Sequence, residues 1–382
     1  MMKKYEVIIL GAGISGIGCA NELLKNNYKD FKIISPNIGG RIMESDNGKV
    51  EYGAYYIMNI YHNSAEFVKK GKKIKIRDLT FHDKKQSYKI IDMKLIKCLP
   101  ELIRLIIILR KFKKHYEKFK KDCIYESQIS GLRKDEYLWE LYNKNTKKFI
   151  SENKIENIVY NYMAEVLHGS GFIQIENLNA FTFLHFSLPL IVPIHEFIFR
   201  KKKAIKVLKK NYIKDEAKKI IKHKGHYEII TKSKKKFLCK NLVIATPPHI
   251  SNKLIKIKGK LRAPANAHMF HMIGEIRKKW KETNYNLFEN KNKMLAIAHQ
   301  RDNSYLFYST GKNPDFKKYF THHKILKYKY WKPAFQIGGS NLIKFNQGKN
   351  LYMIGDNNLC GLEPTYIYGM YCANKILKKS KD

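Results

Sequence analysis

The first sixteen residues hold the feature that most constrains this chain. Residues 5–10 form a mainly apolar run of strand length that leads directly into G-x-G-x-x-G at Gly11, Gly13 and Gly16, and a helical pattern follows through Leu24. Gly11 permits a tight turn at the strand end, Gly13 lets phosphate oxygens approach the backbone, and Gly16 lets the helix pack close to the sheet. The positive end of the helix dipole then faces the phosphates. This order of elements predicts a dinucleotide-binding α/β unit.

Length and cysteine content narrow the class further. A chain of 382 residues, of which 44% are hydrophobic, is long enough for about two to three domains with buried cores. Its six cysteines form no C-x-x-C pair, which argues against a zinc site or a disulfide framework and favours a reducing compartment. No secretory signal is visible, because residues 1–10 already read as part of the fold. We therefore expect a cytoplasmic protein without a bound metal.

The net charge of +41, from 74 Lys and Arg against 33 Asp and Glu, predicts non-specific binding to polyanions or anionic membranes at low salt. The lysines are spread along the whole chain rather than gathered in one tail or helix. Lys, Ile, Asn and Tyr, all abundant here, have A/T-rich codons, so compositional drift is the favoured explanation. We predict no specific nucleic-acid partner.

The second predicted strand, residues 30–35, ends on Ser35, where a dinucleotide site usually has an acid for the ribose hydroxyls. A serine hydroxyl bonds a ribose oxygen more weakly than a carboxylate does. Gly39-Gly40-Arg41 follows. Two more glycines bring backbone near a cofactor, and Arg41 can neutralise pyrophosphate charge bidentately. An ordinary surface turn is the alternative interpretation of these three residues.

Four segments in register resemble the flavin-containing amine oxidase superfamily, which includes amine oxidases, protoporphyrinogen oxidase and phytoene-desaturase-like enzymes. The segments are the glycine loop, G-G-R followed by residues 50–57, the strand 237–248, and G-D at 355–356 with the helix after Gly361. The resemblance implies an α/β fold with a discontinuous Rossmann-like FAD-binding domain and an inserted α+β substrate domain. The implied FAD-binding parts are 1–91, 205–258 and 335–382, and the implied substrate-domain parts are 92–204 and 259–334.

The resemblance also implies roles for single residues. Asp356 matches the acid near the ribityl chain and pyrophosphate, and Glu363 matches the acid at the helix start. Thr365 would point a backbone N–H at the flavin, and Trp331 and Tyr55 are substrate-side candidates. The full set of implied cofactor-binding residues is Gly11, Gly13, Ser15, Gly16, Ser35, Gly39, Gly40, Arg41, Ala217, Thr246, Gly355, Asp356, Glu363 and Thr365.

The middle of the chain contains two apolar runs. Residues 99–112 are too short to span a bilayer and are interrupted by Arg104 and Arg110. With the basic continuation to Lys121 they predict an amphipathic helix, which either lies on a membrane surface or, as we favour, covers a domain core with its basic face in solvent. The run 181–199 contains two prolines, which exclude one continuous spanning helix.

The implied reaction is hydride transfer from a substrate C–H to flavin N5, with the flavin carrying the electron chemistry. Amine oxidases of this superfamily usually present a lysine near N5, but residues 267–276 contain none, and Leu362 stands where their second aromatic residue does. A larger apolar substrate is therefore as compatible with the sequence as an amine. His268 and His271 are acid/base candidates, although strand histidines with structural partners are the favoured interpretation. No catalytic residue is assigned.

Two other classes remain open at this point. A UDP-galactopyranose-mutase-like flavoenzyme uses reduced flavin without net redox, although that family usually has G-G-N in place of Gly39-Gly40-Arg41. A non-catalytic relative, retained as a basic binding protein, is the other alternative, because Ser35 and the missing lysine both depart from the superfamily pattern.

Overall fold

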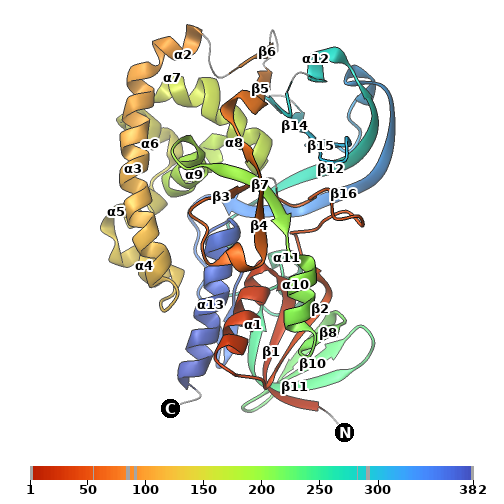
Figure 1. Ribbon diagram of the computed structural model, residues 1–382. Helices are drawn as coiled ribbons and strands as arrows, with labels where there is room; N and C mark the ends of the chain where they lie inside the picture. Colours follow the sequence, from red (N-terminus) through yellow and green to blue (C-terminus); the bar gives the residue numbers. More distant parts are fainter. Residues whose placement is uncertain are drawn as a thin grey trace.

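The computed structural model describes residues 3–54, 56–82, 87–89, 93–281, 283–289 and 293–379. The chain crosses repeatedly between two halves (Figure 1). The lower half in Figure 1 is built on a parallel sheet and carries both termini, and the upper half holds a second sheet and a layer of helices. This arrangement is the α/β unit with an inserted second part that the sequence predicts.

The sheet of the lower half has eight strands in the described residues, with a central order β17-β18-β11-β1-β2-β8. The pairs β18–β11, β11–β1, β1–β2 and β2–β8 are all parallel, and β9 and β10 add an antiparallel meander beside β11. The strands are β1 (Lys3–Gly13), β2 (Phe31–Gly39), β8 (Tyr212–Lys214), β9 (Ala217–Lys222), β10 (Tyr227–Thr231), β11 (Lys236–Ile244), β17 (Asn346–Gly348) and β18 (Leu351–Met353).

The apolar run of β1 is buried on both faces, as a central parallel strand requires. Val7 and Ile9 face a core shared with α1 (Ile14–Lys25) and α13 (Leu362–Lys379), while Ile8 and Leu10 face the β9–β10 meander. A further helix, α10 (Lys201–Leu208), lies beside α1 on the helical face (Figure 1).

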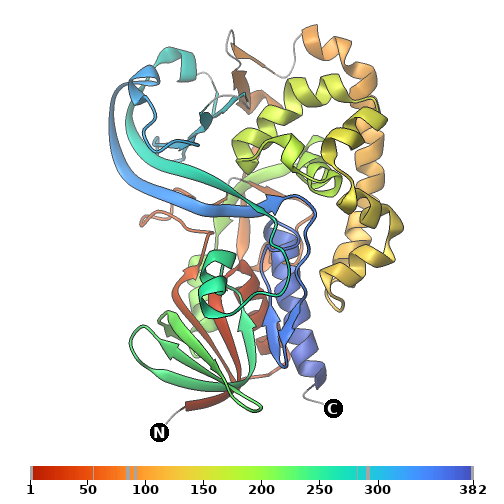
Figure 2. The same cartoon turned by 180° about the vertical axis from the view of Figure 1, so that it is seen from behind.

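The second sheet has the order β16-β12-β15-β14-β13-β5-β6. Its two longest strands, β12 and β16, form a ribbon that arches away from the helices (Figure 2). The strands are β5 (Leu79–His82), β6 (Ser87–Tyr88), β12 (Ala263–Ile276), β13 (Tyr285–Phe288), β14 (Met294–His299), β15 (Tyr305–Ser309) and β16 (Phe320–Gly338).

A small sheet β3-β7-β4 joins the halves, and the helical layer lies beside it (Figure 1). The run 181–199 becomes a helix, a turn and strand β7, in keeping with its prolines. The small-sheet strands are β3 (Tyr56–Met58), β4 (Val68–Ile74) and β7 (Ile194–Phe199). The other helices are α2 (Met93–Lys97), α3 (Leu99–Asp122), α4 (Gln128–Lys134), α5 (Glu136–Asn143), α6 (Thr146–Glu152), α7 (Glu156–Ile158), α8 (Ala164–Gly171), α9 (Ala180–Ser187), α11 (Pro248–Leu254) and α12 (Lys278–Lys281).

The predicted amphipathic helix is α3, which extends to Asp122. One of its faces buries Leu105, Leu109, Phe112 and Tyr116 in the main core, so the interpretation of α3 as a core helix is confirmed.

Among the described residues, we find no helix with both the length and the apolar character that a bilayer crossing requires. All six cysteines are buried free thiols, and the described residues contain no cluster of three or more His, Cys, Asp or Glu side chains suited to a metal ion.

Candidate functional site

The glycine loop has the geometry that its sequence predicts. Gly11 has φ +107°, and a Cβ added there would lie 2.8 Å from the carbonyl oxygen of Ala245. A Cβ on Gly16 would lie 2.0 Å from the carbonyl oxygen of Gly11, whereas a Cβ on Gly13 would meet no heavy atom within 4 Å. Helix α1 begins at Ile14 without a side-chain cap or an acidic residue in its first turn. The loop is therefore packed against backbone at Gly11 and Gly16 and open at Gly13, where an anion can reach the N–H groups at the start of α1.

The second glycine pair lies directly against this loop. Gly39 pairs with Gly13 at the end of the β1–β2 register, and Gly40, with φ +60°, would place a Cβ 3.1 Å from the Cα atom of Gly13. Gly53 is equally confined, because its Cβ would lie 1.5 Å from the carbonyl oxygen of Arg41. The sequence therefore brings three glycine-containing segments to one place in the fold.

Helices α1 and α13 cross in near backbone contact above the sheet. A Cβ on Gly369 would lie 2.1 Å from the carbonyl oxygen of Ser15, and a Cβ on Gly18 would lie 2.6 Å from that of Tyr366. This close packing brings the first turn of α13, with Thr365, beside the same cavity as Ile14.

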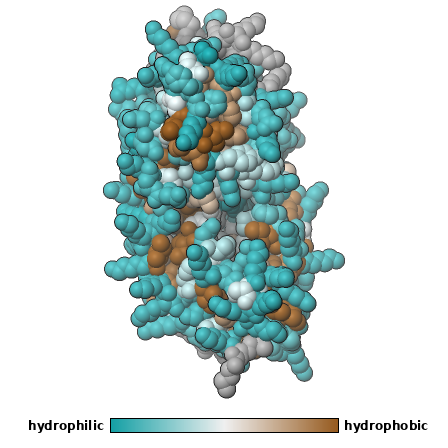
Figure 3. Space-filling view, turned by 90° about the vertical axis from the view of Figure 1, so that its right-hand side faces the viewer, coloured by the Kyte–Doolittle hydropathy of each residue, from teal (hydrophilic) through white to brown (hydrophobic). Residues whose placement is uncertain are grey.

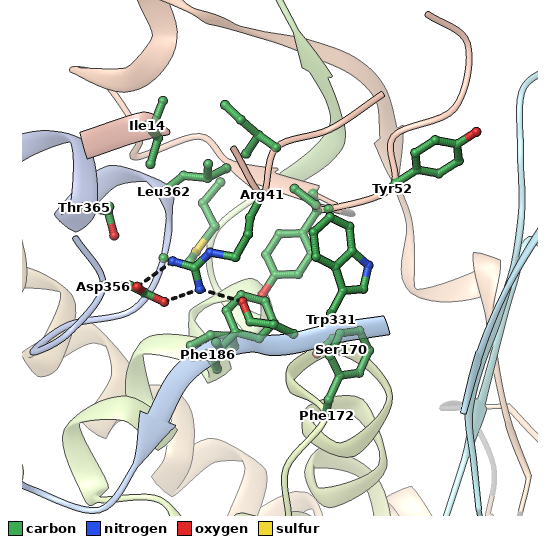
Figure 4. A pocket seen from close by; sticks show the side chains of 18 of the residues that line it. Ile14, Arg41, Tyr52, Ser170, Phe172, Phe186, Trp331, Asp356, Leu362 and Thr365 are labelled. Atoms are coloured by element: carbon green, nitrogen blue, oxygen red, sulfur yellow. Dashed lines mark hydrogen bonds and ion pairs between the residues drawn. The ribbon is translucent and has the colours of Figure 1, made fainter. Parts of the chain in front are cut away.

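A cavity with about 1020 Å³ of empty space, part of it continuous with solvent, extends from Ile14, the residue after Gly13, to the second sheet (Figure 4). Its size suits a substantial organic ligand. Thr365 and Asp356 lie at one end of the view in Figure 4, and Trp331 and Tyr52 lie at the other. The apolar lining includes Ile14, Ile42, Met58, Phe172, Phe186, Phe335 and Leu362.

Arg41 and Asp356 form the charged pair of this cavity. The two guanidinium N–H groups donate to the two carboxylate oxygens over 2.6 and 2.8 Å, and Arg41 also donates to the carbonyl of Ala334. The backbone N–H of Gln336 donates to Asp356 as well. Burial alone raises the pKa of Asp356, but the charge of Arg41 outweighs it and leaves that pKa below its usual value. Likewise, burial alone lowers the pKa of Arg41, but the charge of Asp356 outweighs burial and leaves that pKa above its usual value.

His185 on α9 is a buried wall residue of the cavity that the sequence did not single out. Its Nε2 atom and the hydroxyl of Tyr116 lie 3.2 Å apart in a hydrogen bond. Burial, with a contribution from the nearby charge of Lys120, lowers the pKa of His185 to about 3. The imidazole is therefore neutral at physiological pH. The only sequence signal was a histidine inside an apolar run, which does not reveal what the ring faces.

Tyr52 lines the cavity and connects it to one of the two predicted strand histidines. His271 bonds the Tyr52 hydroxyl through Nδ1 over 3.0 Å and Ser304 through Nε2 over 2.8 Å. The Tyr52 hydroxyl points away from the centre of the cavity (Figure 4). His268 lies between Tyr328 and Tyr330, with ring centroids 5.9 and 4.2 Å away, and is not among the cavity residues.

Trp331 is buried and packs with Tyr52, Ala267 and Met269 in one apolar cluster. It lines the cavity, and its indole N–H has no hydrogen-bond partner among the described residues. The segment before it is part of the long edge strand β16. Tyr55, the other substrate-side candidate, lies outside the described residues.

The remaining predicted residues lie around the parallel sheet but not along the cavity. Ser35 is buried in β2, and its hydroxyl donates to the carbonyl of Asn37 over 2.8 Å. Ala217 begins β9, and the hydroxyl of Thr246 bonds that of Ser251 over 2.9 Å. The predicted adenosine end is thus separate from the cavity.

Glu363 and Thr365, at the start of α13, both have hydrogen-bond partners within the protein. The carboxylate of Glu363 is fully buried and accepts hydrogen bonds from His62, Asn63 and Ser64, so it anchors α13 to that turn. The backbone N–H of Thr365 donates to the carbonyl of Gly361 over 3.3 Å. Thr365 itself lines the cavity, and its contact with a flavin stays a prediction.

Solved structures of other proteins share this architecture. Putrescine oxidase bound to putrescine is similar over 100% of both chains, with a TM-score of 0.67 and 10% identity. A fatty acid isomerase from P. acnes aligns over 97% of this chain and 98% of its own, with a TM-score of 0.69 and 11% identity. Cyclohexylamine oxidase from Brevibacterium oxydans aligns over 99% and 100%, with a TM-score of 0.64 and 12% identity. The chain has the flavin amine oxidase-like fold.

No protein-family model matches the chain, and no curated protein matches it in sequence. The flavin amine oxidase-like fold is thus established by the shape of the whole chain. Proteins with this fold include oxidases and an isomerase, and one fold supports several chemistries. The reaction has to be inferred from the cavity.

Proposed function

We propose that this protein is an FAD-dependent oxidoreductase that takes a hydride from a C–H bond of a small, uncharged and mainly apolar molecule. The observation that carries the proposal is the cavity, which runs from Ile14, directly after the open face of Gly13, to a wall of aromatic side chains. FAD is the group that such a combination suits, because its pyrophosphate needs the loop and its ring system needs an apolar enclosure.

The residues of the site fit FAD by their chemistry. The open face of Gly13 and the uncapped start of α1 would take the pyrophosphate, with Gly11, Gly16, Gly39 and Gly40 shaping the loop around it. Ser15, in the first turn of α1, and Gly355, directly before Asp356, are the other residues that we assign to this cofactor. Ser35, Ala217 and Thr246 would lie on the adenosine side, where the weak serine contact predicts modest affinity.

The charged pair would act on the other half of the cofactor. Asp356 would accept a hydrogen bond from the ribityl chain while Arg41 holds its carboxylate in place. Because the two charges compensate each other, Arg41 contributes less to pyrophosphate binding than an unpaired arginine would. When bound, FAD supplies the hydride acceptor; the chain supplies position, an apolar surround and exclusion of water.

The charge of the cavity favours a neutral substrate. The only charged residues among its described lining residues are Arg41 and Asp356, and they are paired with each other. A protonated amine would therefore find no free carboxylate and would lose its hydration without compensation. His185, which is neutral and hydrogen-bonded to Tyr116, can orient a hydroxyl or carbonyl group of the substrate. Trp331 and Phe335 would confine the apolar part.

A second candidate reaction, double-bond isomerisation of an apolar chain, is favoured by the same lining and by the fatty acid isomerase among similar structures. Anaerobic mixing of the FAD-loaded protein with neutral apolar substrates and with amines distinguishes the reactions. The oxidoreductase proposal predicts bleaching of the flavin band by a neutral substrate and no bleaching by amines. Conversion of substrate without bleaching would favour isomerisation, and bleaching by amines alone would contradict the neutral-substrate assignment.

A further inference from the structure

Helix α3 carries an apolar stripe on the face that points away from the core. Leu99, Ile103 and Ile107 recur at a spacing of four residues and are 42%, 58% and 60% exposed. Ile96, at the end of α2, continues the stripe and is 57% exposed. The opposite face of the same helix is buried in the main core. The exposed isoleucines are therefore not needed to hold α3 in place.

The same stripe becomes basic after Ile107. Arg110, Lys114, Lys118 and Lys121 continue the spacing of three or four residues and are all exposed. At a rise of about 1.5 Å per residue, the apolar and basic halves are each roughly 12 to 17 Å long. One helix face thus changes from apolar to cationic along its length.

Two acidic residues near the stripe, Glu101 and Glu117, are engaged by partners within the protein. Glu101 accepts hydrogen bonds from Asn157 and from the backbone N–H of Ile158. Glu117 accepts from the buried Lys120 over 3.1 Å. The electric field outside the basic half is therefore strongly positive.

Helix α3 lies on the side of the molecule away from the ribbon of β12 and β16 in both opposite views (Figures 1 and 2). The helix α2 lies at its apolar end (Figure 1). The stripe therefore belongs to the helical layer and not to the second sheet.

We propose that α3 docks this protein on an anionic lipid surface, with the apolar half inserted at the level of the headgroups and the basic half lying along them. Partial insertion of exposed isoleucines and attraction of lysines to anionic headgroups are the two contributions that bind amphipathic helices to membranes. This inference is independent of the proposed reaction, because it uses no residue of the cavity.

The pattern fits a lipid surface better than the other occupants. A second copy packed in parallel would bring two rows of lysines together, and an antiparallel copy would set the isoleucines against lysines, so neither arrangement is complementary. A nucleic acid would use the basic half and leave the isoleucines exposed to water. Only an interface that is both apolar and anionic is complementary to the whole stripe.

Co-sedimentation of the full chain with phosphatidylcholine vesicles, with and without phosphatidylserine, tests the proposal. The wild type should bind the phosphatidylserine vesicles more tightly. Ile103→Ser/Ile107→Ser, which leaves the charge unchanged, should weaken binding about tenfold. Lys114→Glu/Lys118→Glu/Lys121→Glu should weaken it on the order of a hundredfold.

Matched controls change the same properties elsewhere. Ile325→Ser/Leu326→Ser removes side chains that are 42% and 47% exposed on β16, on the right-hand side of Figure 1. Figure 3 shows the face on that side, where hydrophilic side chains surround separate apolar patches. Lys218→Glu/Lys219→Glu/Lys222→Glu makes the same charge change on exposed residues of β9. Both controls should bind at least fivefold more tightly than their α3 counterparts.

Equal loss of vesicle binding in the α3 variants and their controls would overturn the proposal in favour of non-specific attraction. A dimer in solution that Ile103→Ser/Ile107→Ser dissociates would overturn it in favour of a second copy. Binding of single-stranded DNA that depends on the α3 lysines, without vesicle binding, would overturn it in favour of a nucleic acid. Unchanged thermal unfolding verifies that each variant is folded.

Discussion

The two walls of the cavity are built from different materials. On the side of the parallel sheet, the wall is backbone packing that lies directly behind the cavity lining, because Gly16, Gly18 and Gly369 each leave less than 3 Å to a neighbouring carbonyl oxygen for an added Cβ. On the side of the second sheet the wall is made of side chains such as His185 and Trp331. The backbone wall therefore tolerates no added side-chain atom at these glycines, whereas the side-chain wall can change its chemistry without changing the fold.

The largest effect is expected where the backbone wall is filled. Gly16→Ala would place a methyl group 2.0 Å from the carbonyl oxygen of Gly11, and backbone cannot move aside as a flexible side chain can. We expect a loss of about 3 kcal/mol or more in the free energy of unfolding, measured by urea denaturation. Gly13→Ala meets open space and should stay within about 0.5 kcal/mol of the wild type. Similar urea midpoints for the two variants would contradict the account of this wall.

The charged pair at the boundary of the two walls should give the next largest effect. Arg41→Met leaves the buried carboxylate of Asp356 without its counter-charge, and we expect a loss of about 3 kcal/mol at pH 7. In the wild type the pKa of Asp356 is lowered, so its stabilisation is present above pH about 4 and is lost as the pH falls through the lower folded value. In Arg41→Met, the carboxyl group of Asp356 stays buried without a nearby positive charge, so its pKa is raised. Protonation of Asp356 then removes the free-energy cost of the buried charge.

The free energy difference between Arg41→Met and wild type should therefore shrink as the pH falls from 7 to 5. Urea denaturation at several pH values measures it. Arg41→Met/Asp356→Asn is the matched control, since it removes both charges and should show no such pH dependence. A difference that is constant over this pH range would argue against a buried ionic pair.

The smallest effect is expected on the side-chain wall. His185→Phe keeps the ring volume but leaves the Tyr116 hydroxyl without its partner, at a cost of about 1 to 2 kcal/mol. Tyr116→Phe/His185→Phe removes both polar groups and should recover most of that loss. The double-mutant cycle in urea unfolding should therefore show coupling, and additive losses would mean that the hydrogen bond contributes little.

The same variant has a predicted pH dependence. Burial holds the pKa of His185 at about 3, below its unfolded value of about 6.5. The unfolded chain therefore binds more protons between these values, and wild-type stability falls as the pH drops through this window. His185→Phe should lose less stability than the wild type between pH 6 and pH 4. An identical pH profile would show that His185 is not buried in its neutral form.

The contrast between the walls also explains which parts could be predicted from the sequence. Gly11, Gly13 and Gly16 are predictable because the tight turn and the close packing that require them are confined to one short segment of the chain. Arg41 and Asp356 were both predicted at the site, but not their direct contact, since 315 positions separate them and no local pattern reports such a pairing.

The side-chain wall was beyond prediction for the same reason. Nothing local links His185 to Tyr116, which lies 69 positions earlier on another helix. His268 and His271 looked equivalent in sequence, yet residues three apart in a strand point to opposite faces. His271 consequently reaches Tyr52, whereas His268 stacks between two tyrosines on the other face.

The most direct test of the central claim is the visible absorption spectrum of the purified protein after incubation with FAD and removal of unbound cofactor, with Gly13→Val and Gly311→Val alongside it. A valine at Gly13 has room in the fold but fills the space in front of the loop, whereas Gly311 contacts only a hydroxyl oxygen 3.9 Å from an added Cβ. The account predicts a flavin spectrum for the wild type and Gly311→Val, and none for a folded Gly13→Val. Flavin retained equally by all three, or by none, would contradict the assignment of the glycine loop as the cofactor site.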